Sequence, residues 1–111
     1  QMIDHADVVP AMNKKYGKDP VYNNVLGYLA AKAGGEAMKA VGGNVEDQAR
    51  FLDALRKVRF DSPGGPFRFD DKQNAIIPTY LRRVEKVGSK LQNTVFDSVS
   101  DVDQFWKPPK R

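Results

Sequence analysis

Several residue types that support chemistry are scarce in this sequence. Its 111 residues include no cysteine, and the only histidine is His5. The absence of cysteine excludes disulfide scaffolds, thiol nucleophiles and cysteine-ligated zinc. A catalytic triad or a histidine-based metal site would have to use His5, near the first residue, so we expect this histidine to be a bystander. The sequence therefore predicts a protein that is not an enzyme and holds no metal or cofactor.

Long apolar runs are also missing. No stretch approaches the roughly 20 residues that a membrane-spanning helix requires. The opening "QMIDHADVV" has neither the basic start nor the apolar block of a signal peptide. If the protein is exported, we expect its leader to lie upstream of this sequence.

The charge of the chain is balanced along its length. The net charge of +4 would suit a small basic nucleic-acid-binding domain. However, 18 Lys and Arg residues are interleaved with 14 Asp and Glu residues, and only "LRRVEKVGSK" and "KPPKR" are locally basic. We interpret this pattern as solvated faces, so no nucleic-acid partner is expected and the nucleic-acid domain is the weaker alternative.

The first 60 residues have the periodicity of helices. A short helix is predicted to end at Gly17, and a longer one runs from about 23 to 41. A third helix is predicted from about 45 to 57, with a capping box formed by Asn44 and Asp47. The apolar stripe of the long helix is rich in alanine and consists of Leu26, Leu29, Ala30, Ala33, Ala37, Ala40 and Val41.

After Phe60 the hydrophobic period changes to two. "PFRFD" predicts a short strand, and "AIIPTYLRRVEKV" and "LQNTVFDSV" predict two more strands joined by a tight turn at 88–90. Pro78 cannot donate to a strand ladder, so we expect it at a sheet edge or a strand start. The order is therefore three helices, then a short strand and a β-hairpin.

The stretch "DSPGGPFRFDDKQN", residues 61–74, is the most suggestive of a ligand loop. A phosphate loop would have to open a helix, whereas "SPGGPF" leads into a strand. A calcium loop starting at Asp70 would place Lys72 at a ligand position, where a cation repels calcium. We interpret the glycines as a sharp corner out of a helix, and "DDKQN" as a polar turn between strands.

Tyr22, Asn23 and Asn24 are the candidate ligand-binding residues. In "DPVYNNVLGY" they stand at the start of the long helix, where an aromatic ring and two amides near free backbone amides suit a small polar ligand. A structural role is the alternative: one Asn caps the helix and Tyr22 packs against its first turn.

The ordered motifs "YGKDP", "GYLAAK", "FDSPGGPFRFD" and "NAIIPTYLRRVEK" resemble the C-terminal part of periplasmic substrate-binding proteins of ABC transporters. The type is the leucine/isoleucine/valine-binding (branched-chain amino acid) one, which includes binders of amides and aromatic acids. The resemblance implies an α/β fragment of a bilobal fold whose upstream lobes are absent from this sequence. Residues 1–60 would pack on the first lobe, and residues 61–111 would cross between lobes.

The same resemblance implies a periplasmic protein that captures a small amino acid-like, amide or aromatic-acid solute and delivers it to a membrane permease. It also places the family's pocket contacts on Tyr22, Asn23 and Asn24. The alternative function is the ligand-sensing domain of a receptor or regulator with the same fold. Because the sheet partners would be missing, we expect the fragment to self-associate or to pair with the rest of its own chain.

Overall fold

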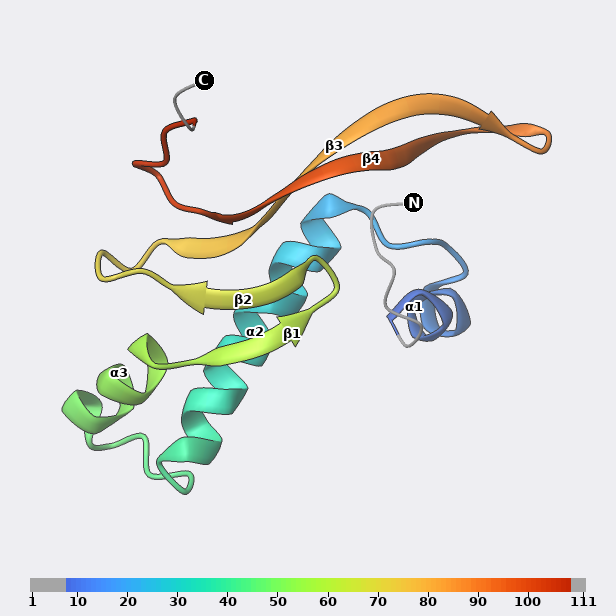
Figure 1. Ribbon diagram of the computed structural model, residues 1–111. Helices are drawn as coiled ribbons and strands as arrows, with labels where there is room; N and C mark the ends of the chain where they lie inside the picture. Colours follow the sequence, from blue (N-terminus) through green and yellow to red (C-terminus); the bar gives the residue numbers. More distant parts are fainter. Residues whose placement is uncertain (1–7, 109–111) are drawn as a thin grey trace.

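The computed structural model describes residues 8–108, so His5 and the opening "QMIDHADVV" up to residue 7 lie outside the described residues. Helices come first and a four-stranded antiparallel sheet follows (Figure 1). The elements are α1 (Val8–Tyr16), α2 (Tyr22–Ala40), α3 (Gln48–Arg56), β1 (Arg59–Ser62), β2 (Gly65–Phe69), β3 (Ala75–Val87) and β4 (Lys90–Val102). The predicted α/β class and the order of helices before strands are confirmed.

The sheet is a meander in which each strand pairs with the next one along the chain. The sequence predicted one short strand before the hairpin, but the structure has two, because β1 pairs with β2. The expected corner out of a helix is therefore the reverse turn between these strands. Ser62 closes it: its Oγ donates to the carbonyl oxygen of Gly65 at 2.7 Å and accepts from the amide of Gly64 at 3.1 Å.

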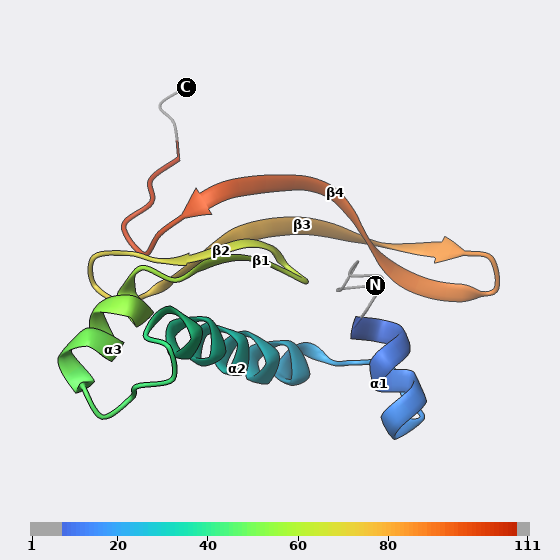
Figure 2. The ribbon, with the colours of Figure 1, turned by 90° about the horizontal axis from the view of Figure 1, so that it is seen from below.

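Helix α2 covers one face of β1 and β2 (Figure 2). Phe67 of β2 is buried beneath the helix, and its ring stacks on Phe60 at a centroid distance of 4.7 Å. At the edge of this contact, Lys32 Nζ donates to the carbonyl oxygen of Asp61 at 3.2 Å. The buried cluster consists of Leu29, Ala33, Ala37, Val58 and Phe67.

The predicted apolar stripe of α2 is wider than the buried face. Its central members Leu29, Ala33, Ala37 and Val41 are buried. Leu26, Ala30 and Ala40 are exposed. Within the described residues the sheet covers the helix from one side, so the flanks of a stripe spanning about 100° remain in solvent.

Helix α3 begins later than the sequence predicted. It starts at Gln48 instead of about residue 45, and Asp47 is its N-cap. The Asp47 Oδ1 accepts from the amide of Arg50 at 3.1 Å, which satisfies one of the free donors of the first turn. The predicted cap, Asn44, lies instead in the turn after α2, where its amide donates to the carbonyl oxygen of Val41.

Strands β3 and β4 form a long ribbon that extends beyond the helices (Figure 1). The predicted tight turn is confirmed at Gly88 and Ser89, with Gly88 at φ 62°. Pro78 is not at a strand start: it lies inside β3, just beyond Ile76, the last residue of β3 that pairs with β2, and the register with β4 shifts between Ile77 and Thr79. The shift leaves that position out of the ladder, so the missing amide of proline breaks no regular pairing.

Candidate functional site

A hollow of about 400 Å³ lies beside the first turns of α2. Its walls come from three segments that are distant in sequence: the start of α2, the β1–β2 turn, and the first half of β3. Leu26 and Leu29 line it from the helix, whereas Ile77 and Pro78 line it from the strand. Tyr22, one of the three candidate residues, stands at the start of the helical wall and is also part of the lining.

The β1–β2 turn and β3 approach each other closely at this hollow. The Tyr80 hydroxyl donates to the carbonyl oxygen of Gly64 at 2.9 Å. At Gly65, where φ is 102°, an added Cβ would lie 2.8 Å from Pro78 Cγ. Glycine is therefore required at this position, both for the left-handed backbone and for the contact with β3.

The structure separates the three candidate residues. Tyr22 lines the hollow, but Asn23 and Asn24 are not among its lining residues. The Asn24 Oδ1 accepts from the amide of Val21 at 2.9 Å, which closes the start of α2, and Asn23 is exposed. A ligand contact through Asn23 or Asn24 stays a prediction, and the hydrogen bond of Asn24 matches the structural alternative for this residue.

Sequence reasoning did not single out two residues of this hollow, Tyr80 and Arg82. They are two positions apart in β3, so both side chains lie on the same side of the strand. The guanidinium carbon of Arg82 lies 5.8 Å from the centroid of the Tyr80 ring. The alternating pattern in "PTYLRR" carries this information, but only the fold shows that α2 faces the same side.

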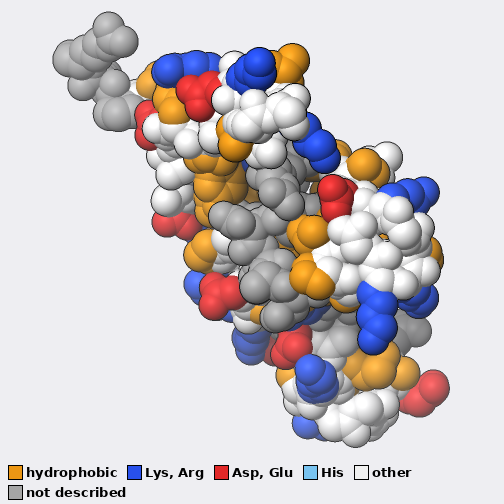
Figure 3. Space-filling view, turned by 90° about the vertical axis from the view of Figure 1, so that its right-hand side faces the viewer, with side chains coloured by type: hydrophobic (Ala, Val, Ile, Leu, Met, Phe, Trp, Pro, Cys, Tyr) orange, Lys and Arg blue, Asp and Glu red, His pale blue; other side chains and the backbone are white. Residues whose placement is uncertain are grey.

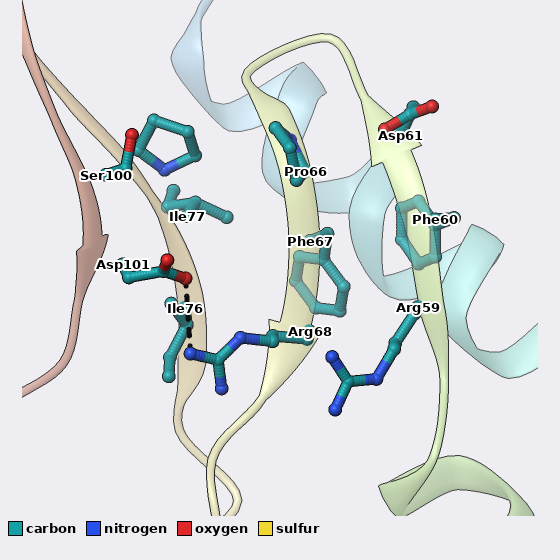
Figure 4. Close-up of a pocket in the computed structure, with 11 residues that line it drawn as sticks. Arg59, Phe60, Asp61, Pro66, Phe67, Arg68, Ile76, Ile77, Ser100 and Asp101 are labelled. Carbon is teal, nitrogen blue, oxygen red and sulfur yellow. Dashed lines mark hydrogen bonds and ion pairs between the residues drawn. The ribbon is translucent and has the colours of Figure 1, made fainter.

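A second hollow, of about 480 Å³, lies along β1, β2, the start of β3 and the end of β4 (Figure 4). Arg59 and Arg68 stand directly opposite each other in the β1–β2 register. Arg68 Nη2 forms an ion pair with Asp101 Oδ1 at 3.2 Å. A carboxylate of this chain therefore already occupies one of the two guanidinium groups that line this hollow.

Charges of both signs are mixed over the face of the molecule seen in Figure 3. Lys and Arg side chains alternate there with Asp and Glu side chains and with hydrophobic patches. A nucleic-acid surface would instead gather cations into one stripe or patch. Among residues 8–108, no helix is long and apolar enough to cross a membrane.

Comparison with known proteins identifies the family. A family model described as "Periplasmic binding protein" matches residues 4–90 of this chain. The chain belongs to that family. Two solved structures of ABC transporter binding proteins place it further, because they are 30% and 31% identical to this chain over the aligned part. These relatives confirm the resemblance to substrate-binding proteins of the leucine/isoleucine/valine-binding type of fold.

The first is an ABC transporter substrate-binding protein from Sphaerobacter thermophilus, with a TM-score of 0.85 and 30% identity over 92% of this chain and 29% of the other. The second is a solute-binding protein from Rhodopseudomonas palustris BisB5 in complex with 3,4-dihydroxybenzoic acid, with a TM-score of 0.78 and 31% identity over 86% of this chain and 26% of the other.

A third structure is a solute-binding protein of an ABC transporter from R. palustris in complex with benzoate. Its TM-score is 0.71, with 30% identity over 88% of this chain and 28% of the other. This periplasmic binding protein chain therefore spans less than a third of the length of each of these relatives. A search of curated proteins found no match.

Proposed function

We propose that this chain is the C-terminal part of the solute-binding component of an ABC importer. The whole protein would work in the periplasm, capture a small aromatic acid between two lobes and deliver it to a membrane permease. The observation that carries this proposal is the family match over residues 4–90 together with relatives in complex with aromatic acids. Those complexes favour an aromatic acid over the amino acid-like and amide solutes that the sequence left open.

The proposed mechanism is lobe closure. A solute that contacts both lobes stabilises the closed form over the open one by its difference in affinity for the two forms. In this scheme residues 1–60 belong with the first lobe, and residues 61–111 carry the crossing between lobes. The long β3–β4 ribbon, which projects beyond the helical part, supports such an assignment.

Tyr22 is the candidate residue that the geometry supports best. It lines an apolar hollow whose volume suits a small ring compound. It also stands at the beginning of α2, where free backbone amides and the helix dipole favour an anionic group. An aromatic ring packed against Tyr22 would bury apolar surface, and the helix dipole would favour a solute with an acid group over a neutral one.

A ligand panel on the full-length protein tests the proposal. Benzoate, its hydroxylated derivatives, leucine and benzamide are each added at saturating concentration, and the melting temperature is measured. Because a ligand at about 100 times its Kd stabilises by ~2.7 kcal/mol, the aromatic acids should raise the melting temperature by a few degrees. A shift with leucine and none with any aromatic acid would overturn the proposed solute class.

Variants of two tyrosines test the site. Tyr22→Ala should weaken binding of the active acid by about tenfold or more in a calorimetric titration, since it removes the aromatic contact. Tyr16→Ala is the matched control, because Tyr16 is equally exposed at 55% but lies on α1 and outside the hollow. Equal effects of both variants would count against Tyr22 as a contact.

A further inference from the structure

Arg82 is the only formally charged side chain among the described residues that line the hollow beside Tyr22. Its Nε is buried and has no hydrogen-bond partner in the described part of the chain. A buried donor without a partner is unfavourable, and more so when the group is charged. The Arg82 guanidinium is therefore a cationic donor in this hollow that a hydrogen-bond acceptor would stabilise.

Two hydroxyl groups of the hollow are already engaged with the backbone. Ser62 Oγ donates to the carbonyl oxygen of Gly65, and the Tyr80 hydroxyl donates to the carbonyl oxygen of Gly64. No carboxylate of the described residues lines this hollow. Arg82 is thus the one cation among the described lining residues, with a buried donor that has no partner, and an anion of the right shape would be its complement.

The position of Arg82 is fixed by its strand. Opposite Arg82, β4 carries one extra residue, Phe96, because the register moves from Leu81–Asp97 to Arg82–Val95. The side chain lies over the Tyr80 ring, and this contact restricts where the guanidinium can go. The ring of Tyr80 and the α2 residues leave an apolar space next to a single cation.

We propose that Arg82 binds the carboxylate of the solute. The solute's ring would then lie among Tyr22, Leu26 and Tyr80, with its acid group on the guanidinium. This inference rests on the proposed function, because it names the residue that makes an aromatic acid the preferred solute. A hydrogen bond between a guanidinium and a carboxylate is charge-assisted and about twice as strong as a neutral one. The low dielectric of an apolar hollow strengthens it further.

The test compares an acid with its neutral analogue in the full-length protein. Benzoate and benzamide have nearly the same shape, but only benzoate carries the negative charge. In the parent protein we expect benzoate to bind more tightly than benzamide. Arg82→Gln should weaken benzoate binding by about ten- to a hundredfold in a calorimetric titration and change benzamide binding by no more than a few fold.

Two variants make the experiment specific. Arg83→Gln is the matched control: Arg83 is the next residue in β3, is exposed, and lies over the Phe96 ring instead of lining the hollow. It should leave the affinity for both compounds unchanged. Arg82→Lys keeps the charge but loses the planar fork, so we expect it to retain part of the preference for benzoate.

The outcomes separate this inference from the proposed function. If neither compound nor any other aromatic acid binds the parent protein, the proposed function fails. If benzoate binds equally well to the parent protein and to Arg82→Gln, the role of Arg82 is overturned and the proposed function stands. If Arg82 pairs instead with an acidic side chain elsewhere in the full-length protein, Arg82→Gln would lower the unliganded melting temperature and leave the preference for benzoate intact, which also overturns the inference.

Discussion

Gly65 is the residue on which the contact between the β1–β2 turn and β3 depends most directly. Gly65→Ala would place a Cβ 2.8 Å from Pro78 Cγ and 3.0 Å from the Tyr80 hydroxyl, in a backbone conformation with φ 102°. We expect a loss of about 1–3 kcal/mol in the free energy of unfolding, measured by urea denaturation. Gly64→Ala is the control, since its Cβ would meet only Ser62 Oγ at an ordinary 3.7 Å. Equal losses for both variants would contradict this account.

Asp70 makes the polar turn between β2 and β3 sensitive to pH. Its carboxylate accepts from the amide of Asn74 at 2.8 Å and from the amide of Lys72 at 2.9 Å. The hydrogen bond to the Asn74 backbone is the main cause that holds the pKa of Asp70 below its usual value, with the Asn74 side chain and Lys72 acting in the same direction. The polar turn predicted for "DDKQN" is thereby confirmed.

The sign of the pH effect follows from the lowered pKa. Asp70 contributes stability that is fully present above the ordinary carboxyl pKa, about 3.9, and is lost as the pH falls through the lower folded value. Asp70→Asn should therefore be less stable than the parent protein at neutral pH, and the difference should shrink in acid. Thermal unfolding at a series of pH values measures it, with Asp71→Asn as the control. A gap that stays constant down to pH 2 would rule out this role.

The residues of the candidate site show what a sequence can and cannot reveal. Tyr22 could be predicted because its position at a helix start is local information. Arg82 could not, because its neighbours come from α2 and from the β1–β2 turn, which are distant in sequence. Asn24 was read as a ligand contact or a helix cap, and only the fold shows its hydrogen bond with Val21.

At the scale of elements, the start of α3 depends on Asp47. Asp47→Ala should lower the free energy of unfolding by about 1 kcal/mol, because the variant loses the acceptor for the amide of Arg50. Asn44→Ala is the matched control, and its effect should stay within about 0.5 kcal/mol, since Asn44 lies in the turn and not at the cap. A larger loss of unfolding free energy for Asn44→Ala than for Asp47→Ala in urea denaturation would instead support Asn44 as the cap, as the sequence predicted.

The elements themselves were mostly predictable, with one instructive failure. Period 3.6 before residue 60 and period 2 after it give the three helices and the later strands in the correct order, although α3 starts later than predicted. Strand β1 was missed because Arg59–Ser62 offers too few alternating residues to be told from a helix end. It becomes a strand only by pairing with β2, which is a tertiary event. Strand β1 also crosses residue 60, the expected boundary between the helical and strand sections.

At the scale of the whole molecule, the sheet has strand edges and exposed apolar side chains that favour association with other chains. Strands β1 and β4 are its two outer strands, and the β3–β4 ribbon exposes Val84, Leu91 and Phe96. Unpaired strand edges and exposed apolar side chains favour pairing with another strand. We therefore expect this chain, expressed by itself, to form dimers or larger species in light scattering. A monodisperse monomer at high concentration would contradict this expectation.

The meander also has a consequence for the order in which the molecule folds. Each strand pairs with its neighbour along the chain, so the sheet can form by closing short loops, which is kinetically fast. The contact between Leu29 and the buried Phe67 region joins residues much farther apart in sequence. During synthesis, α2 leaves the ribosome before β1 and β2 exist to cover its alanine-rich face. Docking of this early helix onto the late sheet is therefore the step at which a newly made chain is most exposed to capture by chaperones or by other copies.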